Sequence, residues 1–288
     1  MSRERYRRRT DWLTYLGLGI VSLFMLLPFI WLLCASLKTQ AVFFEGQFLP
    51  PGDGFLGINW GGLTFDHYAR LLSGEDLPFA RYVLNSVFYA SANAILATFF
   101  CAMGGYALSK YRFKGNGTIT ALVLAALVIP GSLLLAPSYQ LIYELGLLNS
   151  FAGLLLPGLA PAFGLFLFRQ ATMNAVPHDL LEAARIDGMG EFRIFFLIVV
   201  PLIRPMMGAF LLISFMFAWN NFVMPQIILQ DPDKLPLAVG IVQLKGLYST
   251  DFGLIMAGTM VSIIPVMALF LLLQKDFIAG LTSGAVKG

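Results

Sequence analysis

Charged residues and cysteines are scarce in this chain of 288 residues, and each scarcity excludes a class of protein. Asp, Glu, Lys and Arg make up 12% of the residues, against about 25% in soluble proteins. Hydrophobic residues make up 58%, so polar side chains are too few to cover a water-soluble globule. The two cysteines, Cys34 and Cys101, lie in apolar stretches, which argues against a disulfide framework and favours packing roles. The sequence therefore predicts a membrane protein.

Histidines and basic clusters are also few. The formal net charge is only +3, so there is no broad basic surface for a nucleic acid. His67 and His178 lie apart in polar segments, without a clustered carboxylate or a paired nucleophile and base. We expect neither a metal site nor catalytic residues, and the protein is not predicted to be an enzyme.

Charge-free runs locate the predicted membrane spans. Crossing the hydrocarbon core takes about 20 helical residues, and a charge at its centre costs about 2.5–3.5 kcal/mol. Open strands cannot satisfy their backbone in lipid, so each span should be a helix. The sequence predicts an all-α polytopic membrane protein with six transmembrane helices, at 12–35, 82–109, 117–141, 151–168, 205–224 and 253–273. The first run is too long for a cleaved signal peptide, which favours a retained anchor.

The distribution of Lys and Arg predicts the orientation. Fourteen of the 19 basic residues fall in the N-terminal segment, the second and fourth connecting loops and the C-terminal tail. Basic residues gather in cytoplasmic loops, so we expect both termini to face the cytoplasm. The long loops at 38–81 and 231–251 should then be extracytoplasmic, and ordered loops of such length are usually functional.

The loop at 169–204 has the most regular polar pattern. Asp179 suits a helix N-cap, Glu182 suits the third helical position of a capping box, and Gly188 suits a left-handed C-terminal position. A two-turn helix with an apolar side and a polar side is expected. The apolar side is formed by Leu180, Leu181, Ala184 and Ile186, and the polar side by Glu182 and Arg185.

So short a helix is not stable alone in water and must pack on something. It could lie on the inner membrane surface, or it could insert into a groove of a cytoplasmic partner. The paired alanines allow close backbone approach, and Glu182 is unfavourable against an anionic membrane surface. These two features favour the partner.

The same residues resemble a known family. Glu182-Ala183-Ala184, Asp187-Gly188, Pro201-Leu202 and Pro205 are similar to the EAA loop of binding-protein-dependent ABC importer permeases. The carbohydrate-uptake, maltose-type class is indicated by further matches: Asn85-Ser86, Trp219-Asn220-Asn221-Phe222, Pro236-Leu237-Ala238-Val239-Gly240 and Gly284-Ala285-Val286-Lys287-Gly288. One departure is Met189, where the family more often has Ala.

The resemblance implies a type I ABC importer permease fold and a set of partners. These are a sister permease subunit, a dimer of ATPase subunits and an extracytoplasmic sugar-binding protein, in a cell membrane. ATP would be bound by the ATPase partner, and this chain carries no Gly-x-x-x-x-Gly-Lys-Ser/Thr phosphate loop of its own. The ATPase-docking residues implied by the resemblance are Leu180, Leu181, Glu182, Ala183, Ala184, Asp187 and Gly188.

The sequence identifies the residues of the substrate pathway less clearly than those of the docking loop. Sugars bind to hydrogen-bonding side chains and aromatic faces, and the polar candidates are Asn85, Asn93, Tyr139, Gln140, Asn220 and Asn221. For each of them, hydrogen bonding between helices is the simpler explanation. Gly104-Gly105, Pro130, Pro157 and Pro161 are predicted to mark close packing or kinks.

Three parts of the chain are expected. Residues 1–80 would hold the N-terminus, the first span and a long outer loop; 81–275 would form the permease core with the coupling loop at 177–205; and 276–288 would be a cytoplasmic tail. The alternatives are a stand-alone secondary transporter and a permease for a non-sugar solute such as glycerol phosphate. The first would need ionisable residues inside the membrane, and all Asp, Glu, Lys and Arg residues lie outside the six windows.

Overall fold

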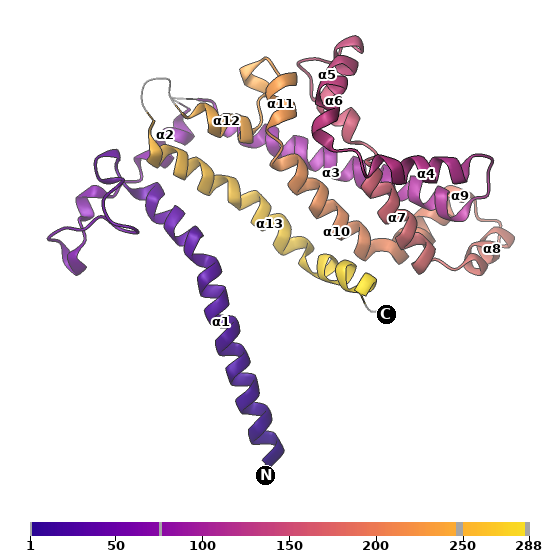
Figure 1. Ribbon diagram of the computed structural model, residues 1–288, viewed down its shortest axis with the longest axis horizontal. Coiled ribbons are helices and arrows are strands. Elements are labelled where there is room, and N and C mark those ends of the chain that lie inside the picture. Colours follow the sequence, from indigo (N-terminus) through magenta and orange to yellow (C-terminus); the bar gives the residue numbers. More distant parts are fainter. Residues whose placement is uncertain (1, 75–76, 246–249, 286–288) are drawn as a thin grey trace. The chain divides into compact units, whose positions relative to one another are not determined.

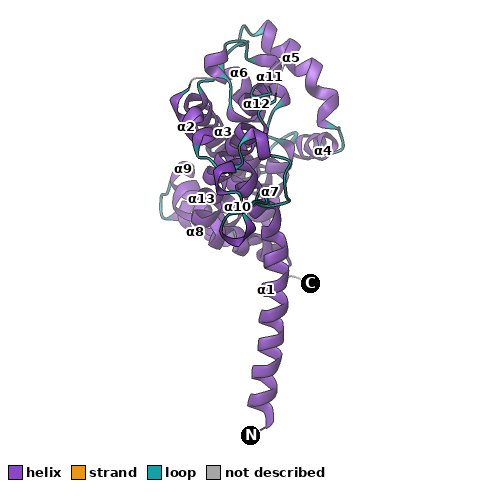
Figure 2. Cartoon of the chain, turned by 90° about the vertical axis from the view of Figure 1, so that its left-hand side faces the viewer, coloured by secondary structure: helices purple, strands orange, loops and turns teal. Residues whose placement is uncertain are grey.

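The computed structural model describes residues 2–74, 77–245 and 250–285, and helices make up most of them. Within these ranges the only β pairing consists of three isolated bridges, and no strand forms. Figure 2 accordingly shows helices joined by loops. The all-α fold class expected from the sequence is confirmed.

The helices follow one another in this order: α1 Ser2–Leu37, η1 Gln40–Val42, η2 Phe55–Gly57, η3 Trp60–Gly62, α2 Asp66–Ser73, α3 Phe79–Lys110, α4 Asn116–Ala126, η4 Gly131–Leu134, α5 Leu135–Glu144, α6 Phe151–Leu155, η5 Leu156–Gly158, α7 Ala162–Ala175, α8 His178–Ile186, α9 Glu191–Ile194, η6 Phe195–Val199, α10 Val200–Trp219, α11 Val223–Ile228, η7 Pro232–Lys234, α12 Leu237–Gln243 and α13 Phe252–Ala285. The segment η6 is a turn of π-helix, and the other η segments are 3₁₀ turns.

Packing divides the chain into two compact units. Unit 1 comprises Met1–Leu77 and Gln243–Ile263, and unit 2 comprises Pro78–Val242 and Ile264–Gly288. The helix α13 therefore contributes its first turns to unit 1 and the remainder to unit 2. Most of the tail predicted at 276–288 belongs to α13, and residues 286–288 lie outside the described residues.

Four described helices are long and apolar enough to cross a membrane, or six if each of two bent pairs counts as one span. The four are Thr14–Leu37, Phe79–Lys110, Glu191–Trp219 and Phe252–Gly280. The bent pairs are Asn116–Ala126 with Gly131–Glu144, and Phe151–Gly158 with Ala162–Ala175. Each of the six predicted spans thus falls on one long helix or one bent pair.

Prolines lie at both bends. The first pair turns by 104° at Pro130, whose extended ψ of 126° interrupts the helical backbone, and the second turns by 45° just before Pro161. A proline ring removes a backbone donor and disfavours helical geometry in the preceding residue. The expectation that Pro130, Pro157 and Pro161 mark kinks is confirmed at Pro130 and Pro161, while Pro157 lies within the short turn η5.

The fifth span begins much earlier than expected. The sequence predicts 205–224, but α9, η6 and α10 form one continuous helical segment, Glu191–Trp219, which carries Arg193 and Arg204. The rule that a charge ends a span was wrong here, because a helix can continue past the hydrocarbon region while its basic side chains reach water. The π-helical turn ends at Val199, two residues before Pro201. Proline has no backbone N–H, so Pro201 cannot donate the hydrogen bond of a regular α-helical turn.

Unit 2 is built around α3, which packs along α7 and α10 (Figure 1). The approach of α3 to α7 is so close that it requires glycine. A Cβ atom on Gly105 would lie 2.6 Å from backbone atoms of Phe168 and Arg169, and one on Gly164 would lie 2.5 Å from the sulfur of Cys101. Cys101 is fully buried in this interface. The packing roles expected for Gly105 and Cys101 are confirmed.

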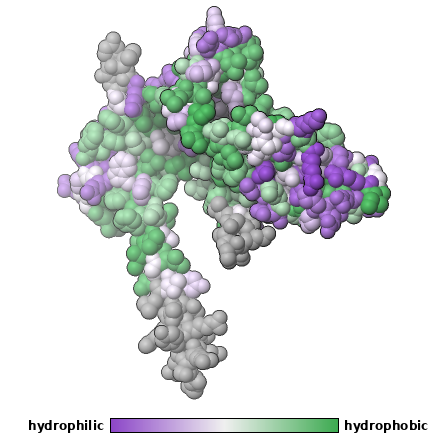
Figure 3. Space-filling view, turned by 45° about the vertical axis from the view of Figure 1, so that its right-hand side comes forward, coloured by the Kyte–Doolittle hydropathy of each residue, from purple (hydrophilic) through white to green (hydrophobic). Residues whose placement is uncertain are grey.

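Hydrophobic side chains cover much of the outer surface (Figure 3). On α1, every residue from Thr14 to Trp31 is exposed, and these residues are almost all apolar. Large unbroken apolar surfaces are rare on soluble monomers. Hydrophilic residues gather instead at the end of unit 2 where α8 and α9 lie. This distribution is the one expected for a protein whose solvent is lipid around its long helices and water at their ends.

The close approach at Gly105 yields a stability prediction. Replacing Gly105 with Ala places a methyl group against the backbone of α7, which cannot yield as a flexible side chain can, and should destabilise the protein by about 1–3 kcal/mol. The measurement is the unfolding midpoint of the purified protein in detergent. The control is Gly117→Ala, where no atom lies within 4 Å of the new Cβ and no loss is expected. Equal midpoints for the two variants would contradict the packing argument.

Candidate docking site

The helix α8 begins two residues earlier than the sequence pattern suggests. Pro177 precedes the helix with an extended ψ of 145°, and the Pro177 side chain makes no capping hydrogen bond. The prediction that Asp179 is the N-cap was wrong, because the proline holds the chain extended and helical geometry starts at His178. Asp179 lies instead in the first turn, where its negative charge favours the helix dipole.

The end of α8 follows the expected pattern. Gly188 has φ of +79°, as a left-handed terminal glycine does. The Gly188 N–H donates to Arg185 O and the Met189 N–H to Ala184 O, both at 3.0 Å. These two bonds form a Schellman motif, in which an apolar residue after the glycine packs on the helix. Met189 fills that position and packs against the buried core, so the unusual methionine fits the turn.

The side chains of α8 separate into an inward and an outward face. Leu181 and Ala184 are buried in a core cluster that includes Tyr106 and Phe168 of the long helices. Leu180, Ala183 and Ile186, spaced three residues apart, are exposed, and Ile186 is 86% exposed. Of the four residues predicted to form one apolar side, only Leu181 and Ala184 are buried. Ile186 lies about 140° or more around the helix from both of them, so the prediction of a single apolar side was wrong.

Glu182 belongs to the outward face. Its side chain is exposed, and within the described residues its carboxylate has no hydrogen-bond or ion-pair partner. Asp187 is also exposed and ends the helix with a backbone bond from its N–H to Ala183 O at 2.9 Å. An apolar stripe beside an unpartnered carboxylate is a surface suited to another protein, while Leu181 and Ala184 hold the helix to this one.

A polar junction that sequence reasoning missed braces α8 from the side. The Arg185 Nε donates to Glu191 Oε1 at 2.8 Å, and the hydroxyl of Tyr111 donates to Glu191 Oε2. The Tyr106 hydroxyl approaches the same oxygen at 3.4 Å, and the Arg185 guanidinium lies 5.8 Å from the centre of the Tyr111 ring. No local pattern could reveal this junction, because Tyr111 lies 80 residues before Glu191.

The junction fixes the protonation states of its members. Burial, followed by the hydrogen bond to Glu191, raises the pKa of Tyr111 above its ordinary value, so its hydroxyl keeps the proton that it donates. The hydrogen bond to Glu191 likewise raises the pKa of Arg185, which is therefore cationic at every physiological pH.

Five of the six residues proposed for the substrate pathway make hydrogen bonds within the chain. Asn85 donates to Asp233 O at 2.9 Å and to Leu235 O at 3.0 Å, which ties the loop before α12 to α3. Asn93 is buried and donates to the Ser214 hydroxyl of α10 at 3.2 Å.

Asn220 and Asn221 directly follow α10, whereas Tyr139 and Gln140 lie within α5. Asn220 donates to Met216 O at 2.8 Å, and Asn221 donates to the Tyr89 hydroxyl at 3.5 Å. Gln140 pairs with Glu144 at 2.9 Å, and Tyr139 is 37% exposed. Asn93 and Asn221 thus show the bonding between helices that was the simpler interpretation, and a substrate role for any of the six stays a prediction.

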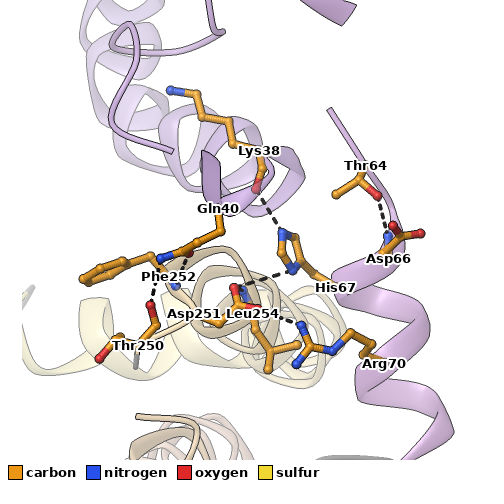
Figure 4. Close-up of polar contacts among 10 residues, drawn as sticks. All are labelled: Lys38, Gln40, Thr64, Asp66, His67, Arg70, Thr250, Asp251, Phe252 and Leu254. Atoms are coloured by element: carbon orange, nitrogen blue, oxygen red, sulfur yellow. Dashed lines mark hydrogen bonds and ion pairs between the residues drawn. The ribbon is translucent and has the colours of Figure 1, made fainter. Parts of the chain in front are cut away.

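Unit 1 contains a second polar cluster, around His67 (Figure 4). The buried His67 donates from Nε2 to Lys38 O at 2.9 Å, and its Nδ1 lies 3.7 Å from Asp251 Oδ1. Arg70 donates to Asp251 Oδ2 at 2.7 Å. His67, which seemed isolated in the sequence, therefore joins α2 both to the end of α1 and to the start of α13. Among the described residues, no group of His, Cys, Asp or Glu could hold a metal ion.

Asp251 is ionised in this cluster. Burial by itself opposes the charge, but the N–H of Leu254, the Arg70 hydrogen bond and the charges of His67 and Arg70 outweigh it and lower the pKa of the carboxyl below its ordinary value. The ionised Asp251 is bound by Arg70, so the cluster holds segments of unit 1 together rather than forming an open ligand-binding site.

Comparison with known proteins identifies a family and several relatives with similar sequences. A family model described as "Binding-protein-dependent transport system inner membrane component" matches residues 94–275. The arabinooligosaccharides transport system permease protein AraQ of Bacillus subtilis is 36% identical over 93% of this chain and 93% of its own length. The lactose transport system permease protein LacG of Rhizobium radiobacter is 31% identical over 98% of each chain.

A solved structure agrees with these matches. One chain in the crystal structure of a bacterial ABC transporter involved in the import of the acidic polysaccharide alginate has a TM-score of 0.77 at 25% identity, covering 95% of this chain and 98% of that one. The family match covers more than half of the chain and includes α8 and the core helices. The chain therefore belongs to the family of binding-protein-dependent transport system inner membrane components, and its resemblance to ABC importer permeases is confirmed.

Proposed function

We propose that this permease forms half of the pathway of a sugar importer and docks on an ATPase subunit through α8. The observation that carries the proposal is the division of α8 into two faces. Leu181 and Ala184 anchor the helix in the permease core, while Leu180, Ala183 and Ile186 remain exposed beside the unpartnered Glu182. A helix in a groove of a partner binds through such a stripe.

Glu182 supplies the polar part of the docking contact. A carboxylate that enters an interface needs a charge-assisted hydrogen bond to offset its lost hydration. We therefore expect a basic side chain of the ATPase to meet Glu182. Leu181, Ala184 and Gly188 contribute indirectly, since they fix the position and the end of the helix rather than touch the partner.

Energy comes from the partner in this mechanism. The chain has no phosphate-binding loop, so ATP is bound and hydrolysed by the ATPase dimer. Closure of that dimer would displace α8, and the continuous segment from Glu191 to Trp219 would carry the displacement into the membrane. A rigid-body rotation against a sister permease would then alternate access to the pathway between them.

The sugar substrate is supported by the names of the relatives, which include permeases for arabinooligosaccharides and lactose. The predicted spans also contain no Lys or Arg, so no cation is available within them for a phosphorylated solute. An extracytoplasmic binding protein would deliver the sugar and set most of the specificity. A solved alginate importer was crystallised with such a periplasmic protein.

We expect the complete reconstituted importer, with its binding protein, to accumulate labelled lactose or arabinooligosaccharides when ATP is supplied inside. Glycerol phosphate in excess should not compete, because the pathway offers hydroxyl and amide groups rather than cations. The measurement is uptake into proteoliposomes. Competition by glycerol phosphate but not by sugars would contradict the sugar assignment, and uphill transport by the permease alone would favour a secondary transporter.

Docking on a cytoplasmic ATPase also requires one orientation, with α8 and both termini in the cytoplasm. Reporter enzymes that are active only outside the membrane should be active when fused after Asp53 or Asp233, because positive charges hold the other loops inside. A fusion after Gly115, in the short loop that also holds Arg112 and Lys114, should be inactive. An active fusion at Gly115 would reverse the proposed topology.

Replacing Glu182 with Lys tests the docking contact. The new cation faces the basic residue expected on the ATPase, and loss of one charge-assisted bond should weaken association by about ten- to a hundredfold. ATP-dependent uptake should fall with it, whereas the amount of permease in the membrane should not change, because the Glu182 side chain is exposed. Association is measured by copurification of the ATPase with the tagged permease.

Glu144→Lys is the matched control, since Glu144 is an exposed acid at the end of α5, on the side predicted to face outward. That variant should bind the ATPase normally. Ile186→Ala offers a second docking variant without a charge change, and its 86% exposure predicts no loss of stability. Normal copurification and uptake with Glu182→Lys would rule out the docking role of α8.

A further inference from the structure

We infer that Glu191 is a positioning residue that fastens the coupling helix α8 to α3 and to α9, so that all three move as one body. The inference rests on the proposed function of α8. Its basis is the meeting of three elements at one carboxylate: Arg185 from α8 bonds to one oxygen, Tyr111 from the end of α3 bonds to the other, and Glu191 itself opens α9.

The covalent connection between α8 and α9 contains two of the least restrained residues in this region. It runs through Gly188 and Gly190, and no atom lies within 4 Å of a Cβ placed on either glycine. Glycine restricts backbone rotation least of all residues. The ion pair from Arg185 to Glu191 spans this connection from one helix to the next and limits the rotation that the glycines permit.

The apolar contact beneath α8 does not fix its direction either. Leu181 and Ala184 lie against the core, but hydrophobic contact is non-directional and tolerates sliding. Hydrogen bonds to an ionised group require defined angles and are stronger than neutral ones. The Glu191 junction therefore supplies the directional part of the attachment.

Two core helices receive the displacement of α8 through this junction. Tyr106 and Tyr111 lie at the end of α3, which packs along α7 and α10. Glu191 begins the continuous helical segment that ends at Trp219. Without the junction, α8 could follow the ATPase while α3 and α10 lag behind, so that ATP would be hydrolysed without transport.

The test compares Glu191→Gln and Tyr111→Phe in the complete importer, reconstituted with its ATPase and binding protein. Neither residue lies on α8, so ATPase copurification and ATP hydrolysis should be retained. The sugar transported per ATP hydrolysed should fall about two- to fivefold, the range expected for loss of one partly exposed charge-assisted contact. The double variant should lose less than the sum of the two single losses, because both changes act on the bond between Tyr111 and Glu191.

The controls are Glu144→Gln and Tyr143→Phe, which make the same chemical changes at exposed neighbouring positions of α5. Their transport per ATP should equal that of the wild type. An unchanged ratio in Glu191→Gln and Tyr111→Phe would overturn the inference, as would loss of the permease from the membrane, which would make the junction a folding element. Failure of the wild-type permease to copurify with the ATPase would defeat the proposed function instead.

Discussion

Helices surrounded by lipid gain little from hiding leucine from hydrocarbon, so their association depends on how closely their backbones approach. In unit 2 that requirement is met where α3 crosses α7 at Gly105 and where Gly164 admits Cys101 and Phe210. The contact positions α3, which also packs on α10 and carries or adjoins residues that bind neighbouring segments. Tyr106 and Tyr111 lie at one end of the helix, and Asn85 lies near the other.

The helix α8 shows how a short segment can serve two proteins at once. Nine residues are too few for an independent helix, yet this one is held by a proline before it, a Schellman motif after it and two buried side chains beneath it. These supports leave its remaining faces free. A rigid, exposed helix loses little conformational entropy on binding, which is an advantage for a contact that must form and transmit force repeatedly.

The sequence was most informative where a property depends on residues that are near one another. Each of the six charge-free runs falls on a described helix or bent pair that is long and apolar enough to cross a membrane, and the position of Gly188 predicted the end of α8 with its left-handed φ. The sequence was misleading where one local rule was used in place of the actual backbone geometry. Arg204 was taken as the limit of the fifth span, although a helix continues through it from Glu191. Asp179 is a residue type that favours the N-cap position, but Pro177 occupies that position and the helix starts directly after it.

Long-range partners escaped sequence reasoning for a different reason. The bond from Tyr111 to Glu191 joins residues 80 apart, and the one from Arg70 to Asp251 joins residues 181 apart. Such pairs come together only when helices pack, and their side chains show no spacing that marks them in advance. The same applies to Asn85 and Asn93, which looked like candidates for binding solute and are bonded to other parts of the chain.

The sequence by itself determined that the chain crosses a membrane, which segments cross it and which loop carries the family pattern. These properties follow from hydropathy, charge and local turn chemistry, all of which act over a few residues. Only the tertiary structure decided which side of α8 faces inward and which residues meet at Glu191. Those outcomes depend on the packing of distant helices, where a difference of one position around a helix turns a side chain by about 100° and exchanges core for surface.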